Sequence, residues 1–241
     1  MLKNRFRVTP SVIPNLFTAM NMFCGFLSII NASEGKYFYS AMLIIIAALF
    51  DALDGIMARL THSSSELGVE LDSLSDLVSF GAAPSFLIFK TQLINYNSIG
   101  IIISSLIMIA GGFRLARFNV QLVGFDKAYF KGLPIPSAAI TVAAFVLEFY
   151  KDGAGFAYPY SSITIPLIMV LSFLMVSTIK YDTLPKFSLK GIKEKPFHFG
   201  FVLACIIILI VTSGKALFYI FVFIILFGIF RHLFYILAKK F

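Results

Sequence analysis

Charged residues are scarce in this chain of 241 residues, which is 13% Asp, Glu, Lys and Arg and 59% hydrophobic. Soluble domains carry about a quarter charged residues, so this composition excludes a single water-soluble core. It also excludes a disordered, collagen-like or coiled-coil chain. The composition therefore indicates a polytopic membrane protein, in which lipid covers most of the apolar surface.

Tryptophan is absent and cysteine occurs only twice. Cys24 and Cys205 lie inside apolar stretches and form neither a CxxC motif nor a disulfide framework, so we interpret both as core residues. Without tryptophan, the membrane interfaces must be anchored by Tyr, Phe, Lys and Arg.

Apolar runs of about twenty residues are typical of transmembrane helices. The predicted helices are Pro14–Ala32, Tyr37–Leu60, Gly68–Phe89, Ser98–Phe118, Pro134–Phe149, Tyr160–Ile179, Phe197–Ser213 and Ala216–Leu237. The first run is long, contains Asn15 and Asn21 and lacks a small-residue cleavage pattern, so we expect a membrane helix there and not a signal peptide. The prediction is an all-α bundle of about eight spans, with residues 1–241 forming one membrane domain.

Basic residues test this count, because Lys and Arg concentrate in cytoplasmic loops. With the N-terminus inside, 16 of the 20 basic residues fall in inner segments and the four outer loops hold one each. This split favours eight spans with both termini cytoplasmic. We therefore interpret the net charge of +8 as an orientation signal and expect no nucleic-acid partner.

Acidic residues are few, yet four of the twelve lie inside two neighbouring predicted spans. Asp51 and Asp54 are in the second span, and Asp72 and Asp76 are in the third. Carboxylates within spans are costly and indicate function by default. The helical repeat places each pair on one face of its helix, so two antiparallel helices would bring all four carboxylates together.

Four adjacent carboxylates require compensating positive charge. Carboxylate oxygens suit Mg²⁺, Mn²⁺ or Ca²⁺, and the cluster contains no His or Cys. The alternative is a set of Asp–Arg pairs that stabilise helix packing, but Arg59 is the only basic residue in the region. The sequence therefore predicts that Asp51, Asp54, Asp72 and Asp76 bind divalent metal ions.

The aspartates belong to a longer pattern, Asp51-x2-Asp54-Gly55-x2-Ala58-Arg59-x8-Gly68-x3-Asp72-x3-Asp76. Every position of this pattern resembles the signature of the CDP-alcohol phosphotransferase family. Further stretches resemble its phosphatidylserine synthase branch: Pro14–Thr18, Ser75–Pro84, Gly112–Asn119 and Gly132–Pro136. The resemblance implies a six-helix core over residues 1–182, two additional helices over 183–241, and a homodimer.

The same resemblance implies a reaction in which the hydroxyl of an amino alcohol displaces CMP from CDP-diacylglycerol; with L-serine the product is phosphatidylserine. Two Mg²⁺ or Mn²⁺ ions on the four aspartates would neutralise the pyrophosphate, and Asp76 would act as the base. The expected CDP-lipid contacts are Asn15, Asp51, Gly55, Ala58, Arg59 and Gly68. Asn15 is equally consistent with a helix cap, Arg59 with a cytoplasmic anchor and Gly68 with close helix packing.

A serine carboxylate needs a cation, and the candidates are Arg114, Arg117 and Lys131. The alternative for either arginine is snorkelling to the interface. Glycerol 3-phosphate or an inositol phosphate would also require cations, so a sister phosphotransferase is one alternative function, and a divalent-cation transporter is another. We expect the site to face the cytoplasm, in a bacterial or archaeal membrane.

Overall fold

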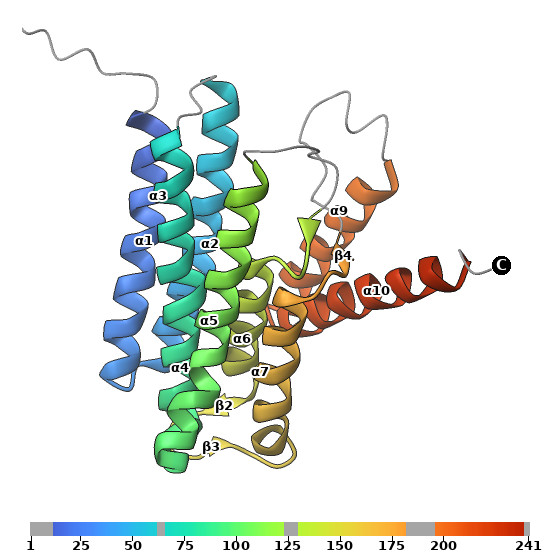
Figure 1. Cartoon of the computed structure of the whole chain (residues 1–241). Coiled ribbons are helices and arrows are strands. Elements are labelled where there is room, and N and C mark those ends of the chain that lie inside the picture. The colour runs from blue at the N-terminus through green and yellow to red at the C-terminus, as the bar shows by residue number, and fades with distance from the viewer. Residues whose placement is uncertain (1–11, 62–65, 123–129, 182–195, 239–241) are drawn as a thin grey trace, which may run out of the picture.

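The computed structural model describes residues 12–61, 66–122, 130–181 and 196–238, and these ranges are mostly helical. The helices of the bundle are α1 (Val12–Ser33), α2 (Tyr37–Leu60), α3 (Glu66–Asp76), α4 (Ala83–Thr91), α5 (Asn97–Leu122), α6 (Ile135–Phe149) and α7 (Tyr160–Val176). They run side by side along one direction in Figure 1. Two more helices follow, α9 (Pro196–Val211) and α10 (Leu217–Ala238).

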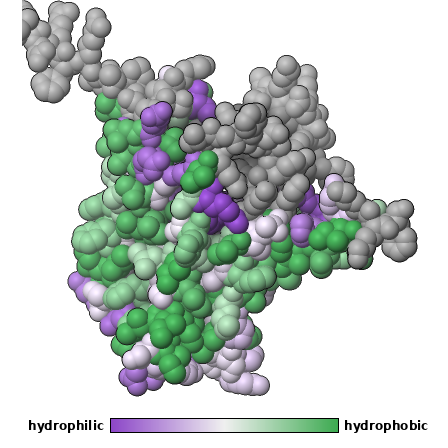
Figure 2. Space-filling model, in the orientation of Figure 1, coloured by the Kyte–Doolittle hydropathy of each residue, from purple (hydrophilic) through white to green (hydrophobic). Residues whose placement is uncertain are grey.

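Several helices of the described ranges are apolar enough for a membrane. Within those ranges, α1, α2, α10 and the stretch Leu93–Val120 are long and apolar enough to span one, whereas α6, α7 and part of α9 are shorter apolar helices. Figure 2 shows hydrophobic residues over the middle of the visible face and hydrophilic ones nearer its ends. The chain is therefore an integral membrane protein, and the number of eight spans stays a prediction.

The predicted third span, Gly68–Phe89, is helical over its whole length, but the helix is not uniform. Between α3 and α4 lies a π-helix, η1 (Leu77–Ala82), in which the N–H of Ala83 reaches the carbonyl of Val78. A π turn inserts an extra residue into the helical repeat, and such turns are frequent at functional sites. The insertion begins directly after Asp76, at the last position of the predicted metal cluster.

The all-α expectation agrees with the described ranges, which are mostly helical, and two pairs of two-residue strands join their loops. β1 (Phe130–Lys131) pairs antiparallel with β4 (Lys180–Tyr181), and β2 (Tyr150–Lys151) pairs with β3 (Gly155–Phe156). The sixth predicted helix ends at Val176 and not at Ile179. Ser177 adopts an extended conformation there, and its hydroxyl caps the carbonyl of Leu174.

The core of the bundle is centred on α6, which contacts α2, α4, α5, α7 and α10. Ten of its 15 residues are buried, and several of these are alanines, including Ala138, Ala139 and Ala143. In a membrane, helices associate through close packing because lipid gives no hydrophobic drive between them, and small residues permit that approach. Pro136 in its first turn suits a helix start, where the missing N–H has no intrahelical acceptor.

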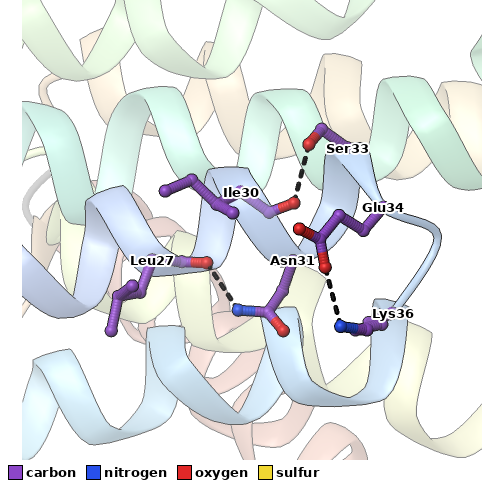
Figure 3. Close-up of polar contacts among 6 residues, drawn as sticks. All are labelled: Leu27, Ile30, Asn31, Ser33, Glu34 and Lys36. Carbon is purple, nitrogen blue, oxygen red and sulfur yellow. Dashed lines mark hydrogen bonds and ion pairs between the residues drawn. The ribbon is translucent and has the colours of Figure 1, made fainter.

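The hairpin of α1 and α2 positions one side of the site. Figure 3 shows three contacts that hold its turn: Asn31 Nδ2 to the Leu27 carbonyl (2.8 Å), Ser33 Oγ to the Ile30 carbonyl (2.7 Å) and Lys36 Nζ to Glu34 Oε2 (2.7 Å). Gly35, at a φ of 78°, supplies the left-handed conformation of the turn. The antiparallel pairing brings the start of α1 beside the end of α2.

α10 differs in direction from the rest of the bundle. In Figure 1 it crosses the other helices at a large angle, and its C-terminal half extends beyond them. It packs against α6 and β4, and an added Cβ at Gly228 would collide with the ring of Tyr181. The sequence correctly predicts a helix at Ala216–Leu237, and its crossing of the membrane stays a prediction.

Candidate functional site

The four predicted aspartates lie on two helices that both pack against α1. Asp51 and Asp54 are in the second half of α2, and Asp72 and Asp76 are in the second half of α3. Asp54 and Asp76 are 7% and 8% exposed, and the other two are half-buried. Buried carboxylates require compensation by charge or hydrogen bonds, so the neighbours of each one decide what this cluster can do.

Asp51, Asp72 and Asp76 form the compact part of the cluster. One carboxylate oxygen of each lies within 4.8 Å of those of the other two. Asp72 Oδ1 is buried and has no hydrogen-bond partner among the described residues. A set of closely spaced oxygens with a buried free acceptor fits a hard divalent cation.

Asp54 lies next to this group with a partner of its own. The hydroxyl of Thr18 on α1 donates to Asp54 Oδ2 over 3.1 Å. Such a hydrogen bond orients a carboxylate in the manner of outer partners at metal sites. The structure thus brings three aspartates into one compact group and fixes the fourth beside it, and metal binding by Asp54 stays a prediction.

Two residues of α1 that the sequence analysis did not assign to the site hold the aspartates. Besides Thr18, Asn21 contacts Asp76, with 3.4 Å from Nδ2 to Oδ1. Two serines also donate hydrogen bonds to the backbone of α1. Ser75 Oγ of α3 donates to the Thr18 carbonyl (3.0 Å), and Ser79 Oγ of η1 donates to the Asn21 carbonyl (2.8 Å). A signal for this face exists in the sequence, as small and polar residues recur every three or four positions at Thr18, Asn21, Gly25 and Ser28.

Gly25 allows α1 and η1 to approach closely. A Cβ at Gly25 would collide with the side chain of Ser79 and lie 2.6 Å from its Cα. We therefore expect Gly25→Ala to lower the stability by about 1–3 kcal/mol, the usual cost of overpacking. The thermal midpoint of purified protein measures this effect, with Gly55→Ala as the control because a Cβ there meets Arg59 at an ordinary 3.7 Å. An unchanged midpoint for Gly25→Ala would contradict the close approach.

The predicted CDP-lipid residues lie at the same end of the bundle as the aspartates (Figure 1). Gly55 and Ala58 are half-buried on α2, and Gly68 is half-buried on α3, one turn before Asp72. Arg59 is exposed, and its Nη1 lies 3.7 Å from the Cβ position of Gly55, so the guanidinium folds back along α2. Asn15 is half-buried in the first turn of α1.

The predicted serine-binding residues have different surroundings. Arg114 on α5 is 8% exposed, and its charge interacts with that of Asp76. Arg117 donates instead to carbonyls at the end of α7, those of Met175 (3.4 Å), Val176 (2.8 Å) and Ser177 (3.3 Å). The side chain of Lys131 lies outside the described residues. The structure thus places the charge of Arg114 near Asp76 and ties the side chain of Arg117 to the end of α7, and serine binding by these three residues stays a prediction.

Known proteins resemble this chain in sequence and in fold. Residues 11–176 match the sequence profile of the CDP-alcohol phosphatidyltransferase family. A CDP-diacylglycerol–serine O-phosphatidyltransferase of Helicobacter pylori is 37% identical over 180 residues, 73% of each chain. An archaetidylserine synthase of Methanothermobacter thermautotrophicus is 40% identical over 172 residues, which are 70% of this chain and 69% of the relative.

Solved structures share the fold at lower identity. The crystal structure of Mycobacterium tuberculosis phosphatidylinositol phosphate synthase with CDP-DAG bound aligns with a TM-score of 0.53 at 21% identity, over 71% of this chain and 84% of that one. A crystal structure of the same enzyme with manganese and citrate aligns with a TM-score of 0.51, also at 21% identity, over 78% of this chain and 93% of that one.

Proposed function

Because the chain belongs to the CDP-alcohol phosphatidyltransferase family, we propose that it transfers the phosphatidyl group of CDP-diacylglycerol to L-serine, giving phosphatidylserine and CMP. The observation that carries the proposal is the convergence of Asp51, Asp72 and Asp76 inside an integral membrane protein. The names of the Helicobacter and Methanothermobacter relatives, a CDP-diacylglycerol–serine O-phosphatidyltransferase and an archaetidylserine synthase, support the choice of acceptor.

Asp76 is the base in this proposal. The serine hydroxyl oxygen forms a bond to the phosphorus of the phosphatidyl group, the bond from that phosphorus to the CMP oxygen breaks, and the hydroxyl proton passes to the Asp76 carboxylate. Asp76 is suited to this role because it is buried and because its carboxylate is held on one side by Asn21. The positive charge of Arg114 nearby compensates the ionised carboxylate before the proton arrives.

Asp51, Asp54, Asp72 and Asp76 would hold two divalent cations, Mg²⁺ or Mn²⁺. When bound, these ions neutralise the pyrophosphate and stabilise the negative charge of the departing CMP. The buried oxygen of Asp72, which has no partner among the described residues, and the oriented carboxylate of Asp54 support the assignment. Manganese in the mycobacterial structure of the same fold is consistent with it.

The CDP-lipid lies along the faces of α2 and α3 that carry the aspartates. Gly55, Ala58 and Gly68 leave room for the nucleotide beside the helix backbones, while Asn15 contacts the cytosine or the ribose. Arg59 folds back over Gly55, which lies one turn after Asp51 on α2. From there its guanidinium can bind a phosphate of the substrate. The acyl chains extend sideways between helices into the lipid.

Gly55→Ala tests the nucleotide position directly. The added methyl group meets the protein only at ordinary contact distance, so the fold remains intact. We expect it to occupy space needed by the nucleotide and to raise the KM for CDP-diacylglycerol about tenfold, a loss of about 1.4 kcal/mol of binding. Steady-state kinetics in mixed micelles measure the change, and an unaltered KM would place the nucleotide elsewhere.

Arg114 binds the serine carboxylate in this proposal, and Lys131 assists. A buried guanidinium offers two parallel hydrogen bonds to a carboxylate. We expect Arg114→Gln to raise the KM for serine about 30-fold, or about 2 kcal/mol, and Arg114→Lys to recover part of the loss. Arg117→Gln is the matched variant one turn away: because Arg117 binds the carbonyls of α7, it should lower the thermal midpoint more than it affects the serine KM. The reverse order of effects would assign serine to Arg117.

The site end of the bundle faces the cytoplasm in our proposal, and the protein spans a bacterial or archaeal membrane eight times as a homodimer. The distribution of the basic residues along the sequence supports this orientation, since eight spans with an inner N-terminus would assign 16 of the 20 to inner segments, as the positive-inside rule requires. Cysteine accessibility in intact cells tests it. A variant with one cysteine at Glu70, which is exposed on α3, should react only with a membrane-permeant reagent.

Acceptor choice separates this function from its sister reactions. Purified protein is incubated with CDP-diacylglycerol, Mn²⁺ and one labelled acceptor at a time: L-serine, glycerol 3-phosphate or an inositol phosphate. We expect a labelled lipid with serine alone. Product with glycerol 3-phosphate or an inositol phosphate, and none with serine, would overturn the serine assignment.

A further inference from the structure

The contact between Asn21 and Asp76 is made by an uncharged side chain inside a cluster of charged ones. Asn21 lies in the middle of α1 and is 0% exposed. Its Nδ2 faces Asp76 Oδ1 at 3.4 Å, because the reversed amide would set two acceptor oxygens against each other. The amide oxygen, Asn21 Oδ1, is buried without a hydrogen-bond partner among the described residues.

The position of Asn21 is fixed by its backbone as well as by its side chain. Ser79 Oγ donates to the Asn21 carbonyl at 2.8 Å, and Ser79 belongs to the π-helix that begins directly after Asp76. One turn further along α1, Gly25 packs directly against the same serine. The backbone of Asn21 is therefore tied to the segment that carries Asp76, so movement of one is coupled to movement of the other.

Packing alone does not explain an amide at this position. A buried polar atom without a partner costs about 1–3 kcal/mol, and an apolar side chain of similar volume would avoid that cost. The bond from Asn21 Nδ2 to Asp76 Oδ1 is long, at 3.4 Å. The amide oxygen of Asn21 has no partner among the described residues and is an acceptor that a ligand or a bound water can satisfy. Both features indicate a role in the reaction.

The chemistry of the amide fits a group that orients a base without titrating. An aspartate here would add another negative charge to the cluster, and a lysine or arginine would pair with Asp76 and oppose its protonation. An amide N–H fixes one oxygen of Asp76 and leaves the other able to take a proton. It therefore positions the carboxylate with little effect on the charge of the site.

We propose that Asn21 is a positioning residue for proton transfer: its N–H holds one oxygen of Asp76, so that the other faces the acceptor hydroxyl. The proposal rests on the proposed role of Asp76 as the base. Thr18, one turn earlier on α1, makes the corresponding bond to Asp54. Helix α1 thus contacts the proposed base, Asp76, through Asn21 and the neighbouring carboxylate of Asp54 through Thr18.

Asn21→Leu tests this role, since it keeps the branching and the number of heavy atoms of the side chain and removes the amide. Loss of a hydrogen-bond partner of a metal-ligating group typically costs 10–100-fold in metal affinity or activity, and we expect the loss here to fall on kcat. The KM values for serine and CDP-diacylglycerol, and the affinity for Mn²⁺ measured by electron paramagnetic resonance, should stay within about threefold. Ser28→Ala is the matched control, because Ser28 is equally buried on α1 but bonds to Ser40, away from the aspartates.

Unchanged kcat for Asn21→Leu would overturn the proposal, and so would a loss of Mn²⁺ affinity that accounts for the whole loss of activity. If Asn21→Leu does not yield folded protein, Asn21→Ala is measured with the same expectations. Asp76→Asn is assayed in parallel. Activity in Asp76→Asn refutes the base itself, whereas an inactive Asp76→Asn beside a fully active Asn21→Leu refutes only the role of Asn21.

Discussion

Asp76→Asn is expected to lower turnover by about 10²–10⁴-fold, the usual contribution of a general base. The substitution preserves the shape of the side chain and an oxygen that can accept the Asn21 hydrogen bond, but an amide does not take the proton of the serine hydroxyl. Removing one negative charge from a buried acidic cluster also relieves repulsion, so the protein should remain folded. Incorporation of labelled serine into lipid measures turnover, and binding of labelled CDP-diacylglycerol measures substrate affinity.

Glu70→Gln is the matched control for this experiment. Glu70 lies on the same helix, is exposed, and accepts a hydrogen bond from Asn119 at 3.3 Å. The same change of carboxylate to amide there should leave turnover within about twofold, because an exposed substitution away from the site has small effects. Turnover by Asp76→Asn that stays within tenfold of the wild type would show that another group takes the proton.

Removal of divalent metal is expected to abolish activity completely. Asp51, Asp72 and Asp76 place three carboxylates within 4.8 Å of one another, and without cations this charge repels the pyrophosphate of the substrate. Dialysis against EDTA should stop the reaction, and added Mg²⁺ or Mn²⁺ should restore it. EDTA saturated beforehand with Mg²⁺ is the control and should have no effect. Full activity in the presence of free EDTA would contradict the metal site.

The metal should also stabilise the fold, since a ligand that binds only the folded state raises its stability. Mn²⁺ at a hundred times its dissociation constant corresponds to about 2.7 kcal/mol and to a higher thermal midpoint. Asp72→Asn should remove most of this increase, because the buried Oδ1 of Asp72 is the oxygen without a partner among the described residues. The midpoint therefore reports metal binding separately from catalysis.

The sequence predicts the helices well because lipid imposes a simple rule on them. Apolar runs near Pro14–Ala32, Tyr37–Leu60, Ser98–Phe118 and Pro134–Phe149 all correspond to helices with ends shifted by a few residues. The grouping of Asp51, Asp72 and Asp76 follows from the helical repeat and from the antiparallel course of neighbouring spans. Carboxylates are energetically unfavourable within membrane spans, so these aspartates are the clearest indication of the site in the sequence.

The sequence pattern does not predict which side chains meet between helices. Periodicity gives the buried face of α1 but not its neighbour, so the bonds of Thr18 and Asn21 to the aspartates required the packed structure. Arg117 lies one helical turn from Arg114, yet it meets the carbonyls of α7, because those carbonyls lack partners where the helix ends. The π-helix after Asp76 is equally invisible to a pattern that assumes a constant repeat.

Serine-dependent release of CMP, measured together with lipid formation in one reaction, tests the central claim most directly. Purified protein receives CDP-diacylglycerol, Mn²⁺ and labelled L-serine, and CMP and labelled lipid are quantified at successive times. The account predicts one phosphatidylserine for each CMP, with both absent when serine is omitted. Release of CMP without serine, or serine-dependent release that yields no labelled lipid, would contradict it.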